Sequence, residues 1–122
     1  MAYIFFWVYA LIVFVFHDSE FAQPRNIFSG HLLAICIGIL INSLLGVSFF
    51  SLGLSVALSV ALMMYFKIMH PPATANLLIA IFANVSYDFI LFPVIAGSII
   101  LILLSMLINK FLFKRKYPKR FI

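Results

Sequence analysis

Long apolar runs, separated by short polar or proline-containing stretches, make up most of this 122-residue chain. From Ile27 to Phe66, forty consecutive residues include no Lys, Arg, Asp or Glu. A helix of that length would measure about 60 Å, which is twice the roughly 30 Å thickness of a bilayer's hydrocarbon core. Gly46-Val47-Ser48 interrupts the run and predicts a turn there. The pattern therefore predicts a helical hairpin of two membrane spans, about 27–45 and 51–69.

The remaining apolar stretches differ in length. Residues 89–112 form another uninterrupted run, with Pro93 tolerable in its first turns, and residues 3–17 form an apolar segment that is short for a crossing. The apolar part of 71–85 is too short to span a bilayer, which favours a re-entrant or broken helix. We expect an all-α, polytopic membrane helical bundle with about four transmembrane helices in a single domain, 1–122.

Composition supports a membrane protein and limits its partners. Hydrophobic residues make up 66% of the chain and charged residues 9%, and the mean hydropathy is +1.25, whereas soluble domains carry about 25% charged residues. Six of the eight Lys and Arg residues lie in Lys110–Arg120. This distribution indicates contact with lipid headgroups rather than nucleic acid, and a cytoplasmic tail, 113–122, at the cell membrane.

The number of crossings decides the orientation. Four crossings put the N-terminus on the cytoplasmic side with the tail, and both proline-containing stretches on the opposite side. If 71–88 crossed fully, we would expect the N-terminus outside and the two stretches on opposite sides. The charge count leaves both arrangements open.

Helical spacing predicts which faces meet protein rather than lipid. His31, Gly38 and Asn42 fall on one stripe of their helix, and a polar and small stripe on a membrane helix should face protein or a cavity. On the next helix, Ser51, Ser55 and Ser59 form one row of small residues. Gly53, Ala57 and Ala61 form a second row, roughly opposite, and such rows allow close helix packing. Two packing faces predict a central position for this helix.

Two stretches break the apolar pattern in the same way: "AQPRNIFSGH" at Ala22–His31 and "MHPPATANLL" at Met69–Leu78. Proline suits the first position of a helix, so Pro24 and either Pro71 or Pro72 predict helix starts, with Gly30 on the first turns of the first helix. Two helix N-termini directed at a common place would favour an anion there. The candidate anion-binding residues that these stretches supply are Arg25, Asn26, His31, His70 and Asn76.

Each candidate also has a structural interpretation. His31 alone could be a buried histidine bonded to a carbonyl, and Arg25 could extend to lipid headgroups. His17, His31 and His70 lack the local spacing of metal ligands, and Cys36 is the only cysteine. No nucleophile motif or phosphate loop is present. We expect no enzyme activity, no catalytic residue, no cofactor and no metal.

The stretches Ala22–His31 and "HPPATAN" at His70–Asn76, followed by "RKYP" at Arg115–Pro118, together resemble the HPP family of integral membrane proteins. The resemblance covers essentially the whole chain, with the motifs in the expected order. It implies a small helical membrane protein of about four spans, with nitrite transport associated with plant and cyanobacterial relatives. Two departures are Thr74, where the family usually has glycine, and Tyr9-Ala10-Leu11, where it has small residues. The family commonly carries more apolar chain upstream, so this chain would lack a first helix.

The function favoured is a transporter or channel for a small inorganic anion, nitrite by family resemblance. The alternatives are a membrane sensor that binds an ion without moving it, and a structural subunit of a larger membrane complex. Because a chain of this size encloses little space, we expect a homo-oligomer, with a dimer favoured.

Overall fold

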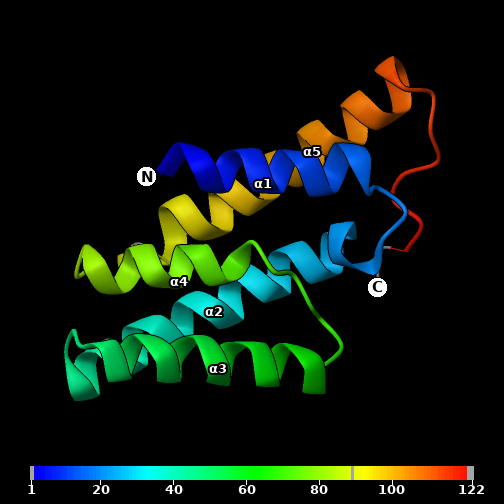
Figure 1. Ribbon diagram of the computed structural model, residues 1–122. Helices are drawn as coiled ribbons and strands as arrows, with labels where there is room; N and C mark the ends of the chain where they lie inside the picture. The colour runs from blue at the N-terminus through cyan, green and yellow to red at the C-terminus, as the bar shows by residue number, and fades with distance from the viewer. Residues whose placement is uncertain (1, 89, 121–122) are drawn as a thin grey trace.

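A computed structural model describes residues 2–88 and 90–120, and over these residues the chain is all-helical, as expected. The helices are α1 (Ala2–Val15), η1 (Glu20–Ala22), α2 (Pro24–Leu45), α3 (Phe49–Tyr65), α4 (Ala73–Phe82), η2 (Ile90–Ala96), α5 (Gly97–Leu107) and η3 (Ile108–Leu112). The long helices lie roughly side by side as an elongated bundle (Figure 1).

Two helices, Pro24–Leu45 and Phe92–Leu112, are long and apolar enough to cross a membrane. The apolar helices α3 and α4 have 17 and 10 residues, so helix length does not confirm the expected count of four crossings. The bundle surface carries large apolar side chains such as Phe49, which is 97% exposed, and Phe92, which is 81% exposed. A surface of this kind suits a lipid environment.

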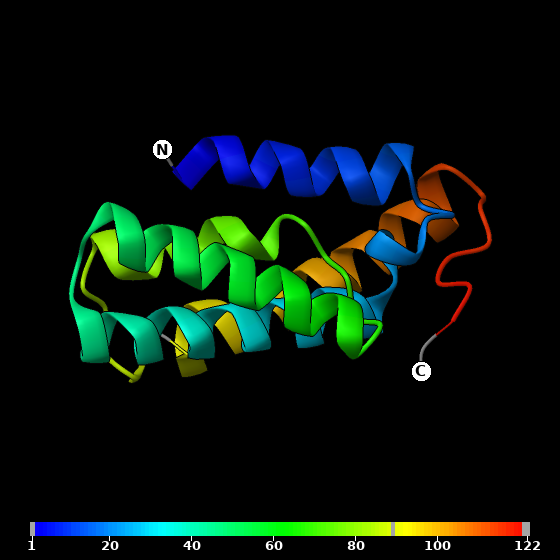
Figure 2. The ribbon, with the colours of Figure 1, turned by 60° about the horizontal axis from the view of Figure 1, so that its bottom comes forward.

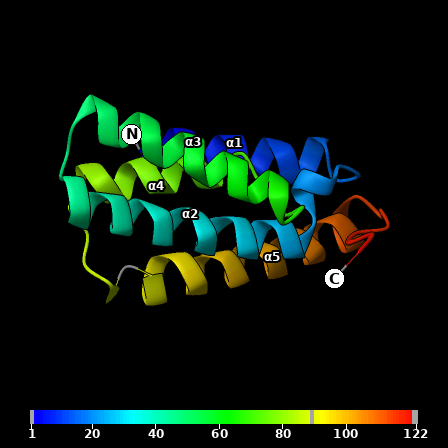
Figure 3. The same cartoon turned by 90° about the horizontal axis from the view of Figure 1, so that it is seen from below.

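Helix α2 occupies the centre of the bundle. It contacts α3, α4, α5 and η2, and Figure 3 shows it between α5 on one side and α3 and α4 on the other. Its residues Ala34, Ile37 and Ile41 are buried in a core with Met63 of α3 and Leu77 of α4. Close packing along this face holds α2, α3 and α4 together, because helices in lipid associate mainly through van der Waals contacts and hydrogen bonds.

Helix α3 lies at the edge of the bundle, so the expectation that it is central is wrong for the single chain. The buried row of Ser51, Ser55 and Ser59 faces α2 and α4. The opposite row is exposed, and a Cβ built on Gly53 would meet nothing within 4 Å. The sequence correctly indicated two small-residue faces, but only one of them is covered by this chain.

Helix α4 runs parallel to α2. His70 packs on Gly30, Leu77 packs on Gly38, and the side chain of Asn42 donates to Asn84 Oδ1 at 2.9 Å. Along these three contacts, the residue numbers increase in the same direction in α2 and in the segment that contains α4. Helix α4 therefore starts near the beginning of α2 and ends near the end of α2. The chain therefore does not return to the end at which α4 begins, as a re-entrant segment would. The broken-helix alternative describes it better, because ten helical residues cover only about 15 Å.

One end of the bundle gathers both proline-containing stretches and the tail. The amide groups of Lys119 and Arg120 donate to Gln23 Oε1 at 2.9 and 3.2 Å, and Asn26 Nδ2 donates to the Met69 carbonyl at 3.2 Å. The expectation that the tail and the two stretches lie at opposite ends is therefore wrong. Figures 2 and 3 show the start of α2, the end of α3 and the tail together at one end. We call this the basic end, because all eight Lys and Arg residues belong to segments that meet there.

Candidate functional site

The two proline-containing stretches meet inside the bundle. Asn76 on α4 donates through Nδ2 to Nδ1 of His31 on α2, at 2.8 Å. The rings of His31 and His70 are 4.9 Å apart between centroids and nearly edge to face. The polar stripe of α2 thus faces protein, as the helical spacing predicted, and its first member belongs to a histidine pair.

Gly30 makes this approach possible. It lies one residue before His31, where the backbone of α2 touches the segment that leads into α4. A Cβ at this position would come 2.8 Å from His70 Cβ and 3.3 Å from the Ile68 carbonyl oxygen. Because those contacts are too short for any larger residue, glycine determines how closely the two stretches approach each other.

The start of α4 is satisfied from within its own stretch. The backbone N–H groups of Ala73, Thr74 and Ala75 donate to the carbonyls of His70, Pro71 and Pro72 respectively, at 3.0 to 3.2 Å. These N–H groups are the ones that a helix N-terminus would offer to an anion. The expectation that α4 directs free N–H groups at a ligand is therefore wrong, and anion binding here must rely on side chains.

The start of α2 is different. Pro24 occupies its first turn and has no N–H group. The N–H groups of Arg25 and Asn26 follow within that turn, where a helix has no internal acceptor for them. Both residues line a cavity, described below. The α2 N-terminus thus remains a candidate for contact with an anion.

The hydrogen bonds define where the two histidines carry their protons. His31 Nδ1 accepts from the amide of Asn76, so a neutral His31 carries its proton on Nε2. His70 Nδ1 lies 2.7 Å from the Phe21 carbonyl oxygen and donates to it. A neutral His70 therefore has a bare Nε2, and this atom is buried with no hydrogen-bond partner among the described residues.

Tyr9 is a site residue that the sequence did not single out. Its ring lies 5.8 Å from that of His70 and 6.5 Å from that of His31. Its hydroxyl is buried and has no partner within the described part of the chain. Tyr9 is one of the residues that depart from the family pattern. Because α1 is apolar on all sides, its sequence does not indicate that Tyr9 lies next to both histidines.

Two cavities lie beside the histidine pair. The outer cavity, of about 480 Å³, opens at the basic end and is lined by Arg25, Lys67, Arg120, Glu20, Asn26 and Met69 among others. The second cavity, of about 370 Å³, which we call the inner cavity, is lined by Tyr9, His31, Asn76, Pro72, Pro93 and Ser98 among others. It also opens at the bundle surface, where Pro93 and Ile100 are exposed. The predicted site residues are therefore divided, with Arg25 and Asn26 on the outer cavity and His31 and Asn76 on the inner one.

The other predicted residues connect or frame these cavities. Asn26 borders the outer cavity and is bonded to the backbone of Met69, next to His70. His70 is fully buried and lies against His31, which borders the inner cavity. Pro71 is exposed, while Pro72 is buried and directly precedes α4. Asn26 and the histidine pair thus connect the lining of one cavity to the lining of the other, and we call these three residues the polar septum.

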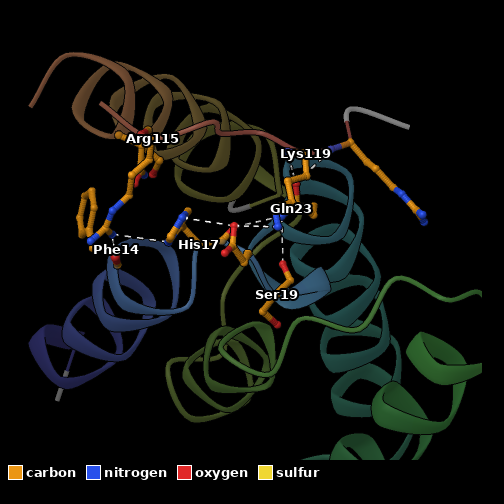
Figure 4. A network of polar contacts seen from close by, with 10 residues as sticks. Phe14, His17, Ser19, Gln23, Arg115 and Lys119 are labelled. Atoms are coloured by element: carbon orange, nitrogen blue, oxygen red, sulfur yellow. Dashed lines mark hydrogen bonds and ion pairs between the residues drawn. The ribbon is translucent and has the colours of Figure 1, made fainter. Parts of the chain in front are cut away.

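The tail is bound to the start of α2 by a network of polar contacts (Figure 4). Gln23 is its centre: its amide donates to the carbonyls of His17 and Ser19, and its Oε1 accepts from the Lys119 and Arg120 amides. Arg115 donates to the Phe14 carbonyl at 2.8 Å. The third motif, Arg115–Pro118, thus packs against the first and holds Arg120 at the outer cavity.

Two titratable groups belong to this network. The Tyr117 hydroxyl donates to the Ala22 carbonyl at 2.6 Å, and burial raises the pKa of this phenol. The Lys119 ammonium, 3.0 Å from Asp18 Oδ1, donates a hydrogen bond that lowers the pKa of the Asp18 carboxyl. Within residues 2–88 and 90–120, no three His, Cys, Asp or Glu side chains lie close enough together to hold a metal ion.

The sequence of this chain is similar to those of known membrane proteins. The sequence model of the family "HPP, transmembrane region" matches residues 8–118 of this chain. Two transmembrane proteins of Dictyostelium discoideum are 34% and 32% identical to this chain, in alignments 117 positions long that cover 89% of this chain. The chain spans about two fifths of the length of these relatives, 41% and 38%. No solved structure matches.

The matched region includes Tyr9, both proline-containing stretches and the tail motif through Pro118. It also includes the residues that line both cavities, except Arg120. The site described above therefore consists almost wholly of residues within the family's transmembrane region. On this evidence the chain belongs to the HPP family of transmembrane proteins.

Proposed function

We propose that this chain conducts a small inorganic anion across the membrane, from the outer cavity past the histidine pair to the inner cavity. The observation that carries the proposal is the polar septum between the two cavities. One side of the septum faces a cavity bordered by three cations and one carboxylate. The other side faces a smaller cavity with uncharged polar groups.

The outer cavity supports attraction of anions. Arg25, Lys67 and Arg120 border it, against the single carboxylate of Glu20. A cleft lined mainly by one sign of charge concentrates ions of the opposite sign and accelerates their association. A cation would be repelled from the same entrance, so the charge balance favours anion selectivity.

The inner cavity supports passage of a small ion without tight binding. Uncharged polar residues line it: Asn76, His31, Tyr9 and Ser98. Neutral donors in an apolar setting orient an anion, yet they hold it less strongly than a fixed buried cation would. With a volume of about 370 Å³, the cavity suits nitrite, nitrate, chloride or formate. Nitrite is favoured among these by the association of HPP relatives with its transport.

The charge distribution also supports an orientation. All eight Lys and Arg residues gather at the basic end, and the loops that flank a membrane protein on its cytoplasmic side carry an excess of these residues. We therefore assign the basic end, with the tail, both proline-containing stretches and the outer cavity, to the cytoplasmic side of the cell membrane.

The test is anion uptake by purified protein in liposomes, compared across nitrite, nitrate, chloride and formate. Arg25→Gln should reduce uptake of the preferred anion about fivefold, the factor that about 1 kcal/mol represents. Lys116→Gln is the matched control, because Lys116 is an exposed cation of the tail that borders neither cavity.

Two outcomes would assign the chain to the other classes. Anion binding to the detergent-solubilised protein without any uptake into liposomes would favour a sensor. Neither binding nor uptake above protein-free liposomes would favour a structural subunit, and either result overturns the transport proposal.

A further inference from the structure

We propose that the His31–His70 pair takes up one proton with each anion, so that proton and anion cross together without net charge. This inference rests on the proposed function and names the ion coupled to it. It is argued from the unpartnered nitrogen of His70, from the absence of a fixed cation beside it, and from the cost of a buried unpaired anion.

The Nε2 atom of His70 is the proton acceptor. Nδ1 is committed to the Phe21 carbonyl at 2.7 Å, so the lone pair of a neutral His70 is on Nε2. That atom is buried, with no partner among the described residues. A buried acceptor without a donor is unfavourable in a packed site. Such an atom indicates a partner that is present in another state of the cycle. A proton converts it into an N–H donor, and the anion itself can then accept that hydrogen bond.

Among the side chains that the structure describes, none with a fixed charge faces the pair. Tyr9 of α1, the Phe21 carbonyl of η1, Asn26 of α2 and Asn76 of α4 are the groups that face the two rings or bond to their segments. All of them are neutral. The charged groups nearest along the path, Arg25, Lys67, Arg120 and Glu20, line the outer cavity instead.

An anion that leaves the outer cavity therefore loses its counter-charge. Transfer of an unpaired ion into an apolar interior is strongly unfavourable. One proton on the pair, beside the inner cavity that His31 borders, supplies a positive charge where the path otherwise offers only dipoles. In the step itself, an O–H bond of a hydronium ion breaks to leave water, the Nε2 lone pair of His70 forms an N–H bond with the released proton, and the resulting imidazolium accompanies the anion.

The cycle closes when the anion reaches the far side. The N–H bond at Nε2 then breaks, the electron pair returns to the nitrogen, and the proton leaves to water with the anion. The histidines are neutral again, each with the hydrogen bond that fixes its tautomer. No charge is left behind, and no oxidant or further reactant is needed.

The test measures proton movement directly. Liposomes that contain the protein and a trapped pH-sensitive dye are given a gradient of whichever of the four anions they take up best, and protein-free liposomes correct for leakage of the neutral acid. We expect about one proton to enter with each anion. The uptake rate with the membrane potential clamped at zero should equal the rate at about 100 mV. For an anion that crosses without a proton, a potential of about 100 mV biases the movement about fiftyfold.

Histidine variants test whether His70 is the proton acceptor. Glutamine keeps polar atoms of similar reach but does not hold an added proton, so His70→Gln should abolish proton entry and remove the pH dependence of anion uptake. His17→Gln is the matched control, since His17 lies in the tail network rather than at the septum. If His70→Gln fails to fold, His31→Gln tests the same pair from α2.

The possible results separate the two proposals. Anion entry without protons, at a rate that follows the membrane potential, would overturn proton coupling and leave anion transport in place. Coupled entry that persists unchanged in both histidine variants would overturn the assignment to this pair. Absence of anion entry by the wild-type protein would overturn both proposals together.

Discussion

Gly30 and His70 touch backbone to side chain: a Cβ on Gly30 would lie 2.8 Å from His70 Cβ. This contact joins α2 to the non-helical segment between α3 and α4. It sets the level in the bundle at which His70 meets His31. The position of the septum between the two cavities therefore depends on the absence of one methyl group.

Gly30→Ala should destabilise the protein by about 1–3 kcal/mol, because the neighbouring atoms are backbone and a buried Cβ that cannot move aside. Thermal unfolding in detergent measures the change. Gly53→Ala is the matched control, since nothing lies within 4 Å of its added Cβ, and alanine favours a helix over glycine by up to about 1 kcal/mol. Equal unfolding temperatures for Gly30→Ala and wild type would contradict the close contact.

The tail should lose stability when its buried hydroxyl is removed. Tyr117→Phe leaves the Ala22 carbonyl without the donor that now lies at 2.6 Å, and an unsatisfied buried acceptor costs about 1–3 kcal/mol. Chemical unfolding in detergent provides the measurement. Tyr87, which is 71% exposed, supplies the control Tyr87→Phe. Indistinguishable unfolding of the two phenylalanine variants would show that the tail is not bound in this way.

Attachment of the tail should weaken in acid. The hydrogen bond from Lys119 holds the pKa of Asp18 below its usual value, so the docked tail favours the ionised carboxylate. This contribution is complete above the free carboxyl's pKa of about 3.9 and is lost as the pH falls through the lower, docked value. A spin label at Lys116→Cys, with Cys36 replaced by serine, should report greater mobility near pH 3 than at pH 7. Asp18→Asn should remain mobile at both pH values, and a label insensitive to pH in the wild-type background would refute the link.

The path of α4 predicts which positions label from which side of a membrane. Lys67→Cys and Lys116→Cys belong to the basic end, whereas Ser86→Cys follows α4 near Asn84, at the end where Asn42 lies. In a background without Cys36, an impermeant thiol reagent should reach the first two from one side and the third from the other. Labelling of all three from the same side would restore the re-entrant path for 71–85.

The exposed row of α3 is our candidate for self-association. Gly53→Leu and Ala57→Leu should reduce a homo-oligomer, with a dimer favoured, because added side chains prevent close helix contact. They should leave the monomer fold intact, since Gly53 and Ala57 are exposed in the single chain. Oligomer mass in detergent measures the effect, with Leu58→Ala as control. Unchanged mass in both leucine variants would exclude this face as the interface.

The sequence predicted which residues face the site better than it predicted how the chain runs through the bundle. Regular spacing put His31, Gly38 and Asn42 on one face, and all three do face α4, because a helix has a fixed period. The two proline-containing stretches were expected to converge, and His31, His70 and Asn76 do. Arg25 remains apart from them on the outer cavity, a separation that depends on tertiary packing alone.

Three features escaped prediction for physical reasons. A hydropathy pattern measures whether a helix can span a bilayer, but it does not detect that a non-helical segment such as 66–72 can lead a short helix into the bundle. The tail network depends on side-chain bonds to backbone carbonyls around Gln23, and such bonds have no periodic signature. The Tyr9 contact was missed because α1 lacks a polar face that would orient it.

The gathering of the cations at the basic end also bears on how the chain enters a membrane during synthesis. The connections at the opposite end, 46–48 and 83–88, contain between them one charged side chain, Asp88. If the bundle spans the bilayer along its length, neither of these connections carries a lysine or arginine through the hydrocarbon. The barrier to translocating them is correspondingly low, and reversing the chain would require eight cations to cross instead. In that arrangement Arg25, Lys67 and Arg120, which border the outer cavity, are among the side chains that would set the topology.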